Sequence, residues 1–228
     1  MSELGTVIVT GGSSGLGAAT AAAVAEAGGL PVVLDRVPPP AGHDHELVDL
    51  AYTREAERAV ERVAERHGGL KAVVTAAAMD VPGRLDRVPA ETWERIVMVN
   101  LFGTVAVVRA ALPHLERSSG RVVTVSSTLG FRVFGDATAY CASKFGVVGF
   151  TRSLAAETAG RVGVTLLVPG GMRTAFFDEC EPEYKPGPDA MLNRPEDVAA
   201  AVLFALRQPV GVELRELVIT PAIEPSWP

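Results

Sequence analysis

The sequence predicts an α/β protein with a doubly wound, three-layer fold, in which a seven-stranded parallel sheet lies between two layers of helices. Short runs rich in valine, isoleucine and leucine alternate with longer helical patterns along the whole chain of 228 residues. This alternation is typical of a parallel sheet with crossover helices. The runs are apolar almost throughout, as expected for strands that helices cover on both faces. We therefore expect a single domain over residues 1–228.

Turn residues and helix-ending residues mark the boundaries of the elements. Glycine pairs at 28–29 and 68–69 end two helices, and the second of these helices carries an apolar stripe along one face. Three consecutive prolines make 37–45 a loop, because proline fits neither a helix interior nor a central strand. The expected elements, in chain order, are strand 4–10, helix 15–27, strand 30–35, strand 46–50, helix 53–69, strand 70–78, helix 90–116, strand 120–127, helix 136–159, strand 162–168, helix 195–207 and strand 215–220.

Composition and charge exclude several classes of function. The net charge is −6, and no basic tract is longer than two residues, so nothing indicates binding to nucleic acid. The longest uncharged apolar run, residues 96–108, is well short of the roughly 20 residues needed to span a bilayer. Cys141, Cys180 and the four histidines match no disulfide framework or metal-ligand spacing. The chain also begins without a positively charged leader, so we expect a cytoplasmic protein with reduced thiols, no metal and no membrane partner.

The stretch VTGGSSGLGAAT, residues 9–20, permits two interpretations. Gly11, Ser13 and Gly15 form G-x-S-x-G, the nucleophile elbow of serine hydrolases, but no histidine follows a strand where a catalytic triad would need one. Gly11, Gly15 and Gly17 instead form a glycine-rich turn between the first strand and the first helix. Backbone N–H groups and the positive helix end can hold a pyrophosphate there. The sequence favours this second interpretation, although the spacing is not G-x-G-x-x-G and a purely structural turn stays open.

Asp35 adds to the case for a dinucleotide. It ends the second strand, 20 residues after Gly15, where a carboxylate can accept hydrogen bonds from the hydroxyls of an adenosine ribose. Its charge would repel a 2′-phosphate and so favours NAD over NADP, whereas Arg36, which follows, could tolerate a phosphate. The alternative is that Asp35 only caps the proline-rich turn.

A second group of candidate residues lies between residues 100 and 144. Tyr140 and Lys144 are four residues apart and share one helix face. An ammonium beside a phenol favours the phenolate, so we expect Lys144 to lower the pKa of Tyr140 and make it an acid or base near neutral pH. Ser127 ends the fifth strand and can reach the same crevice, and Asn100 lies in an apolar helix where its side chain needs a partner. Each residue also has a simpler explanation: Tyr140 and Lys144 could be paired by chance, Ser127 could start a turn, and Asn100 could bridge two helices. The occurrence of all four residues in this order, after the glycine loop, favours a catalytic site.

Together these motifs resemble the short, single-domain, NAD(P)-dependent members of the short-chain dehydrogenase/reductase family over essentially the whole chain. The resemblance implies a Rossmann-type fold and reversible hydride transfer between a nicotinamide cofactor and a ketone or secondary alcohol. The matching features are TGGSSGLG at 10–17, Asp35, the pair Asp49-Leu50, Asn100, Ser127, Tyr140-x-x-x-Lys144 and PGGMRT at 169–174.

The resemblance also implies a role for each catalytic residue. Tyr140 would be the general acid/base, and Ser127 would polarise the substrate oxygen. Lys144 would hold the nicotinamide ribose, and Asn100 would help to anchor a water in a proton relay. A small-molecule carbonyl or alcohol is the expected substrate.

The cofactor-binding residues implied by the resemblance follow the carboxyl ends of the strands. Asp49 would lie beside the adenine ring with a backbone contact from Leu50, and Thr174 would contact the nicotinamide carboxamide. A serine at position 14, where NADP-preferring relatives often carry a basic residue, agrees with the preference for NAD. The complete expected set is Gly11, Ser13, Ser14, Gly15, Leu16, Gly17, Asp35, Arg36, Asp49, Leu50, Ala76, Tyr140, Lys144, Pro169, Gly170, Met172 and Thr174.

Two segments depart from the family pattern. Thr75-Ala76-Ala77-Ala78 stands where the family usually has Asn-Asn-Ala-Gly, which removes side-chain hydrogen bonds and places a Cβ near the cofactor. We expect a local adjustment there. The last residues also lack the usual Asp-Gly-Gly ending, which leaves the choice between dimer and tetramer open.

The same resemblance suggests how substrate and subunits meet the core. Residues 175–194 are expected to form a mobile substrate lid, whose acidic residues either suit a polar or cationic substrate or are simply solvated. The helices at 90–116 and 136–159 would pair across a two-fold axis, so we expect a homodimer or homotetramer. The alternative function is a non-catalytic NAD(P)-binding sensor or scaffold protein. An epimerase or dehydratase of the extended family would need a larger substrate domain.

Overall fold

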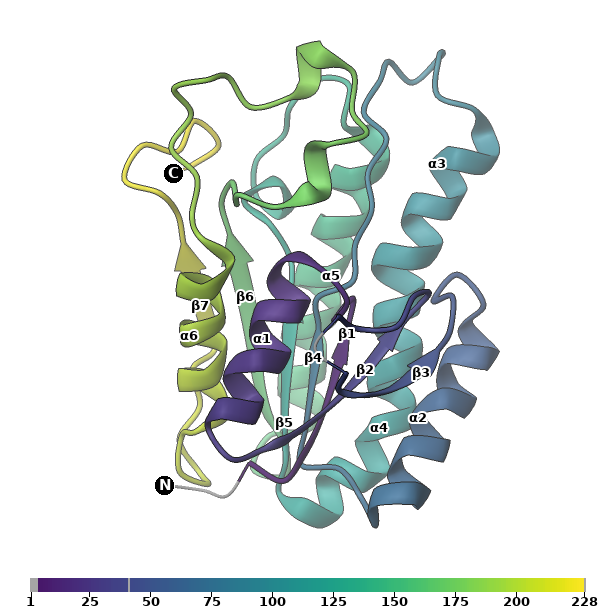
Figure 1. Cartoon of the computed structure of the whole chain (residues 1–228), viewed down its shortest axis with the longest axis vertical. Coiled ribbons are helices and arrows are strands. Elements are labelled where there is room, and N and C mark those ends of the chain that lie inside the picture. Colours follow the sequence, from purple (N-terminus) through teal and green to yellow (C-terminus); the bar gives the residue numbers. More distant parts are fainter. Residues whose placement is uncertain (1–3, 41, 228) are drawn as a thin grey trace.

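The computed structural model describes residues 4–40 and 42–227 and confirms the doubly wound α/β fold (Figure 1). Its strands pair in parallel in one seven-stranded sheet with the order β3-β2-β1-β4-β5-β6-β7. The strands are β1 (Thr6–Thr10), β2 (Leu30–Asp35), β3 (Asp44–Leu47), β4 (Ala72–Thr75), β5 (Arg121–Val125), β6 (Gly163–Pro169) and β7 (Glu216–Ile219). The α-helices are α1 (Gly15–Glu26), α2 (Thr53–His67), α3 (Ala90–Val97), α4 (Thr104–Ser118), α5 (Thr138–Glu157) and α6 (Pro195–Leu206).

Helices cover both faces of the sheet, and the strand side chains alternate between them. Figure 1 shows α1 and α6 in front of the sheet and α2, α4 and α5 behind it. In β1, Val7 and Val9 belong to the core that α1 and α6 complete, whereas Ile8 belongs to the core completed by α2 and α4. All three are fully buried. Because strand residues point alternately to the two faces, a fully covered strand must be apolar at every position.

The chain reverses direction across the sheet at β1. From β1 it moves outward through β2 to the edge strand β3, and it then returns to β4 on the other side of β1. In such sheets a crevice opens at the carboxyl ends of the two strands that flank the reversal, and ligands bind there. The loops after β1 and β4 therefore border the expected site.

The third strand, Asp44–Leu47, begins two residues before and ends three residues before the predicted strand 46–50, so the predicted bounds are wrong. β3 pairs only with β2, and an edge strand does not need apolar side chains on both faces. Asp44 and Glu46 instead form ion pairs with Arg66 of α2, at 3.1 and 2.6 Å. The sequence of the strand is therefore polar, and Val48 and Leu50, just beyond it, belong to the core.

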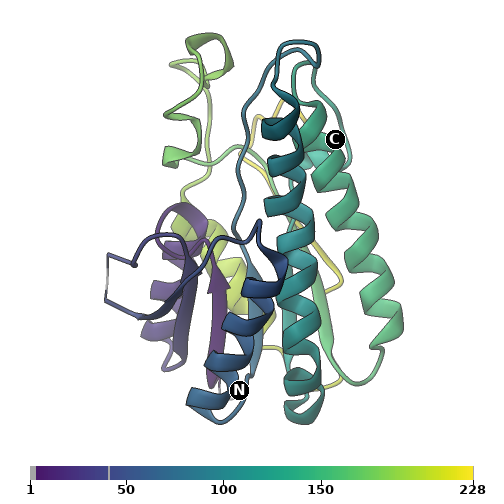
Figure 2. The ribbon, with the colours of Figure 1, turned by 90° about the vertical axis from the view of Figure 1, so that its right-hand side faces the viewer.

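The long helix expected at 90–116 is continuous but not uniformly α-helical. It consists of α3, a π-helical turn η1 (Met98–Gly103) and α4. Over Ala90–Ser118 it is long and apolar enough to cross a membrane by length and composition. Its apolar residues, such as Val107, Ala111 and Leu115, are buried against the sheet and α2, which identifies it as a core helix. Figure 2 shows it beside α5, extending above the sheet.

A long segment between β6 and α6 covers the carboxyl ends of the strands, as expected for the lid at 175–194. It contains the short 3₁₀ helices η3 (Ala175–Phe177) and η4 (Pro182–Tyr184), and Figure 1 shows it in green above α1 and β6. Its two ends are joined by a bridge between Met172 and Asn193. The Arg173 N–H also donates to the Asn193 carbonyl at 2.9 Å.

Candidate active site

The predicted catalytic residues come together where β5 ends. Ser127 follows β5 and caps the short 3₁₀ helix η2 (Thr128–Gly130), with its Oγ accepting the Leu129 N–H at 3.1 Å. Tyr140 and Lys144 lie one turn apart near the start of α5. The Tyr140 hydroxyl is hydrogen-bonded to Ser127. Two elements far apart in sequence thus place a serine and a tyrosine hydroxyl side by side.

Lys144 is held in place by burial and by one backbone acceptor. Its side chain is 2% exposed, and its Nζ donates to the carbonyl of Val125, at the end of β5, over 3.0 Å. Burial lowers the pKa of Lys144 to about 8, against the opposing charge of Asp80. The ammonium lies 5.5 Å from the centroid of the Tyr140 ring. Lys144 is therefore a fixed positive charge beside the tyrosine at neutral pH.

The pKa of Tyr140 moves in the opposite direction to the sequence-based expectation. We expected Lys144 to lower it, but burial raises the pKa of Tyr140 well above its ordinary value, and Asp80 raises it further. The hydrogen bond with Ser127 lowers the pKa but does not outweigh burial. Burial is the largest of these effects, and the Lys144 ammonium, which lies over the ring and donates to Val125, does not offset it. The phenol is consequently protonated at neutral pH.

Asn100 sits inside the π-turn and clamps the segment after β4. It is 1% exposed; its Oδ1 accepts the Met79 N–H at 2.8 Å and its Nδ2 donates to the Met79 carbonyl at 2.9 Å. Nδ2 also donates to Ser143 Oγ on α5 over 3.1 Å. π-turns are rare and frequently occur at functional sites. The partner that an amide in an apolar helix requires is thus the backbone of the β4 loop.

The sequence analysis missed two residues of this region. Ser143, fully buried, donates to the Tyr140 carbonyl at 2.7 Å and so links Asn100 to the catalytic helix. Asp80 follows Met79, and burial raises its pKa to about 6, although the Val81 N–H and Lys144 favour the ionised form. A polar residue between Tyr140 and Lys144 was the only hint of the first. An isolated acid in a loop has no spacing that could have indicated the second.

The backbone of the glycine loop fits a bound pyrophosphate. Gly11 and Gly15 have φ values of +67° and +51°, in the left-handed region that favours glycine. A Cβ at Gly17 would overlap the Gly11 carbonyl, and one at Gly11 would lie 2.7 Å from the Cα of Ala77. α1 starts at this loop with no side-chain cap and no acidic residue in its first turn. Its first N–H groups and its positive end can therefore receive an anionic group.

The contacts of Ser13 do not support the nucleophile elbow. Its Oγ donates to the carbonyl of Val37 at 2.6 Å, and its N–H donates to Asp35 Oδ2 at 3.0 Å. Asp35 Oδ1 accepts the Arg36 N–H at 2.6 Å. Asp35 thus braces the glycine loop, a contact that neither interpretation of Asp35 included, and its carboxylate lies at the edge of that loop, where a ribose would be recognised. The Ser14 and Arg36 side chains are exposed beside it.

The predicted adenine side of the site is closed by an ion pair. Asp49 Oδ2 lies 2.5 Å from an Arg95 guanidinium nitrogen, and Oδ1 accepts the Ala51 N–H at 3.0 Å. Partial burial opposes ionisation of Asp49, but these contacts hold its pKa below the ordinary value. Leu50 is buried and packs against Gly103, where a Cβ would come within 2.8 Å of it. The role of Arg95 was not visible in the sequence.

The segment expected to meet the nicotinamide lies next to the glycine loop. A Cβ at Gly15 would lie 3.3 Å from the methyl group of Thr174, and Thr174 Oγ1 accepts the Phe176 N–H at 3.3 Å. Pro169 is buried at the end of β6, and the Gly170 N–H donates to the carbonyl of Ile219 at 2.9 Å. The structure therefore places the segment expected to meet the nicotinamide beside the expected pyrophosphate turn. Leu16 and Met172 pack into the core that α1 and α6 cover.

The segment 75–78, at the end of β4 and beyond it, is held by few side-chain hydrogen bonds. Thr75 Oγ1 is buried without a hydrogen-bond partner among the described residues. The Ala77 N–H instead donates to Thr10 Oγ1 at 3.1 Å, and Ala76 packs against the core. A hydroxyl from β1 thus ties this segment to the neighbouring strand.

The lid contacts the candidate catalytic tyrosine directly. The ring of Phe176 packs edge-on against Tyr140, with centroids 5.9 Å apart, and Phe177 packs on Phe176 at 5.4 Å. Farther along, the Tyr184 hydroxyl donates to Asp136 Oδ2 at 3.3 Å. The lid therefore supplies an aromatic wall to the site.

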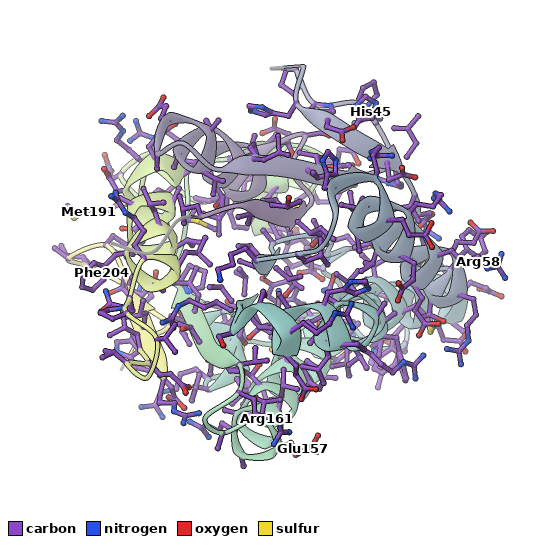
Figure 3. The ribbon with its side chains drawn as sticks, turned by 90° about the horizontal axis from the view of Figure 1, so that it is seen from below. His45, Arg58, Glu157, Arg161, Met191 and Phe204 are labelled. Atoms are coloured by element: carbon purple, nitrogen blue, oxygen red, sulfur yellow. The ribbon has the colours of Figure 1, made fainter. Side chains whose placement is uncertain are left out.

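The outer helices carry charged surfaces that take no part in this site. A groove along α2 and α4 is lined mainly by arginines and glutamates. Among them, Glu57 pairs with Arg54 at 2.8 Å and also with Arg109. Figure 3 shows Arg58 of α2 pointing away from the body of the protein. Within the described ranges, no three metal-ligating side chains gather in one place, and Cys141 and Cys180 are free thiols.

Comparisons with known proteins identify the family of this chain. The profile of the short chain dehydrogenase family matches residues 5–185. The chain belongs to the short-chain dehydrogenase/reductase family. An uncharacterized oxidoreductase of Staphylococcus aureus (strain MRSA252) is 31% identical over 94% of this chain and 96% of that protein. One from Staphylococcus saprophyticus is also 31% identical, with the same coverage of both chains.

Solved structures show the same fold. The aldohexose dehydrogenase of Thermoplasma acidophilum superposes with a TM-score of 0.85 at 25% identity, covering 94% of this chain and 92% of that one. An alcohol dehydrogenase from Thermococcus sibiricus, complexed with 5-hydroxy-NADP, gives 0.85 at 24% identity and covers 95% and 96%. The short-chain dehydrogenase/reductase described here is accordingly an NAD(P)-dependent oxidoreductase that acts on a small molecule.

Proposed function

We propose that the protein interconverts a ketone and a secondary alcohol with NAD(H), and that Tyr140 is its general acid/base. The observation that carries this proposal is the hydrogen-bonded pair of Ser127 and Tyr140 hydroxyls beside the fixed ammonium of Lys144. This group lies at the same sheet edge as the glycine loop. A non-catalytic sensor or scaffold would have no need to hold all three side chains in this arrangement.

The residues present fit a dinucleotide. The backbone of Gly11, Gly15 and Gly17 would hold the pyrophosphate, and Asp35 would accept the ribose hydroxyls. When bound, the nicotinamide ring would supply or accept the hydride. Binding both reactants in one crevice would align them, which supplies much of the acceleration in such reactions.

The protein's own groups would handle the proton. In the direction of reduction, the hydroxyls of Ser127 and Tyr140 would donate hydrogen bonds to the carbonyl oxygen, and Tyr140 would transfer its proton to the developing alkoxide. A tyrosine that burial keeps protonated is suited to this step. The Lys144 ammonium would stabilise the phenolate that remains. The water relay through Asn100 stays a prediction. The two hydrogen bonds between the Asn100 side chain and the Met79 backbone support a role in holding the segment after β4 beside the site.

We further propose a preference for NAD over NADP. Asp35 places a negative charge at the edge of the glycine loop, where a 2′-phosphate would have to bind. Ser14 offers no positive charge to such a phosphate. Arg36 is exposed and is the one neighbouring cation that could weaken this preference.

The assembly and location are also proposals. Phe102 and Phe145, on η1 and α5, are 49% and 44% exposed, which supports pairing of these long helices in a homodimer or homotetramer. The free thiols of Cys141 and Cys180 are in keeping with the reducing cytoplasm.

The central test is the Tyr140→Phe variant. Removing the hydroxyl should lower kcat by about 10²- to 10⁴-fold, the usual contribution of a positioned acid or base. The dissociation constant of NADH, measured by fluorescence titration, should change by less than about threefold, because the hydroxyl is not part of the pyrophosphate turn. Tyr52→Phe, at an exposed tyrosine, is the matched control.

Turnover is followed as loss of the reduced cofactor's absorbance over a panel of ketones. If Tyr140→Phe keeps more than a tenth of the wild-type rate, Tyr140 is not the acid/base. If the wild-type protein binds NADH but reduces no member of the panel, the sensor alternative replaces the enzyme proposal.

A further inference from the structure

The segment after β7 makes contacts that the proposed mechanism does not use. Residues 221–227 return over the carboxyl ends of β5 and β6, and Figure 1 shows this segment in yellow near the lid. Trp227 packs edge-on against Phe131, with centroids 5.7 Å apart, and Ser226 is 6% exposed. A surface tail would not bury a serine to this extent.

The Glu224 carboxylate binds the loop that follows β6. Its Oε2 accepts the Gly171 N–H at 2.8 Å, and a Cβ at Gly170 would overlap the carboxylate. Gly170 of the PGGMRT segment thus leaves the space that the Glu224 carboxylate fills. Glu224 thereby holds the backbone of the segment that would meet the nicotinamide.

The same carboxylate is joined to the loop that carries Ser127. Glu224 Oε1 accepts the N–H of Ser226 at 3.1 Å and its hydroxyl at 2.6 Å. Ser226 Oγ also lies 2.7 Å from the Oγ1 of Thr128, the residue after Ser127. A serine hydroxyl has one proton, so if it is donated to the carboxylate, the Thr128 hydroxyl is the donor of the second bond. The chain of contacts therefore runs from Gly171 through Glu224 and Ser226 to Thr128.

The charge of Glu224 is stabilised by these partners. Burial alone would raise its pKa, but the hydrogen bonds from Ser226 and Gly171 hold it below the ordinary value. The carboxylate is therefore ionised across the pH range of an activity assay. Charge-assisted hydrogen bonds of this kind are stronger and shorter than neutral ones.

We propose that Glu224 and Ser226 are positioning residues that fix the distance between the Gly170–Thr174 segment and Ser127. This inference rests on the proposed function, in which that distance sets how the hydride donor faces the substrate carbonyl. Displacement by about 1 Å of a group that aligns the reactants can cost about 10²-fold in rate. The two residues would act through the loops and would not touch the substrate.

The test compares Glu224→Gln and Ser226→Ala with a matched control. Glu213→Gln removes another carboxylate that accepts a backbone N–H, that of Val164, but at the opposite end of β6. The first two variants should lower kcat by about tenfold or more, and the NADH dissociation constant should change by less than about threefold. The control should keep the wild-type kcat. The urea unfolding midpoint reports whether each variant is folded.

A double variant separates positioning from simple destabilisation. If Glu224 acts through the Ser127 loop, Glu224→Gln should cost less than about twofold when Ser127 is already alanine, because residues that act as a unit are not additive. A full additional tenfold loss would overturn the inference. So would an unchanged kcat in both single variants, or a fall in kcat matched by equal loss of NADH affinity.

Amide hydrogen exchange tests the connection without turnover. Glu224→Gln should speed exchange in residues 126–131 and 169–174 and leave the β1–α1 loop unchanged. Unchanged exchange in both segments would refute the connection even if the enzyme is active. If the wild-type protein reduces no ketone while exchange responds as expected, the proposed function fails and the structural connection stands.

Discussion

Replacing Asp80 by asparagine should stabilise the protein at neutral pH. Burial raises the pKa of Asp80 from 3.8 to about 6, which corresponds to roughly 3 kcal/mol at about 1.4 kcal/mol per pKa unit. The carboxyl group is partly exposed and solvent screens its charge, so we reduce the expected gain to about 1–2 kcal/mol. The amide oxygen of asparagine can still accept the Val81 N–H that Asp80 Oδ1 accepts at 2.9 Å.

The pH dependence gives this prediction its sign. The folded state has the higher pKa, so it binds more protons than the unfolded state between about pH 4 and pH 6, and stability falls as the pH rises through that window. The cost of ionised Asp80 is complete above that window. The gain from Asp80→Asn should therefore be largest at about pH 7.5 and should shrink toward about pH 5.

Urea unfolding at a fixed protein concentration measures the effect, because an oligomer's stability depends on concentration. Asp86→Asn is the control, since Asp86 is exposed near the same loop and pairs only with Arg84 on the surface; it should change stability by less than about 0.5 kcal/mol. The reasoning is refuted if Asp80→Asn is no more stable than the wild type at neutral pH. A gain of equal size at both pH values would refute it as well.

Two further predictions concern the proposed cofactor site. Asp35→Ala should weaken NADH binding by about tenfold, because it removes the acceptor for the ribose hydroxyls. NADPH binding should weaken less, because the change also removes the charge that opposes a 2′-phosphate. Fluorescence titration measures both dissociation constants, and an unchanged ratio between them would contradict this prediction. Gly17→Ala should lower NADH affinity by at least about tenfold and destabilise the fold by about 1–3 kcal/mol, because its Cβ would overlap the Gly11 carbonyl. Gly187→Ala, where the added Cβ meets nothing within 4 Å, is the control in urea unfolding and in titration, and equal effects of the two changes would show that the overlap is not the cause.

The sequence was most informative where one physical requirement dictates residue type. A central parallel strand must be apolar on both faces, so β1, β4 and β5 were visible as continuous runs. The edge strand β3 has no such requirement, and its polar start, with Asp44, was assigned to the preceding loop, which shifted the predicted strand toward the apolar residues beyond it. The prediction failed there because half of the strand's environment is solvent and a helix surface.

The same distinction applies to the candidate site. Tyr140 and Lys144 could be predicted as a pair because a helix brings positions four apart onto one face. Whether a lysine ammonium points at a phenol oxygen or over the ring depends on Val125, a backbone acceptor from another element. No spacing in the sequence encodes that contact or the burial of the phenol, and it is burial that raises the pKa of Tyr140 against the predicted direction. The contacts of Asn100 with Met79 and of Glu224 with Gly171 could not be predicted for the same reason, because each joins residues that are distant in sequence.

The bridge between Met172 and Asn193 has a consequence for how such enzymes diversify. Because the two ends of the lid are fastened side by side at the sheet edge, the intervening residues can lengthen or shorten without moving the strands beneath them. Each doubling of a flexible loop adds only about 0.6 kcal/mol of closure entropy. The fastening therefore allows this one segment to be exchanged for another of different length or composition, while Ser127, Tyr140 and the glycine turn keep their positions.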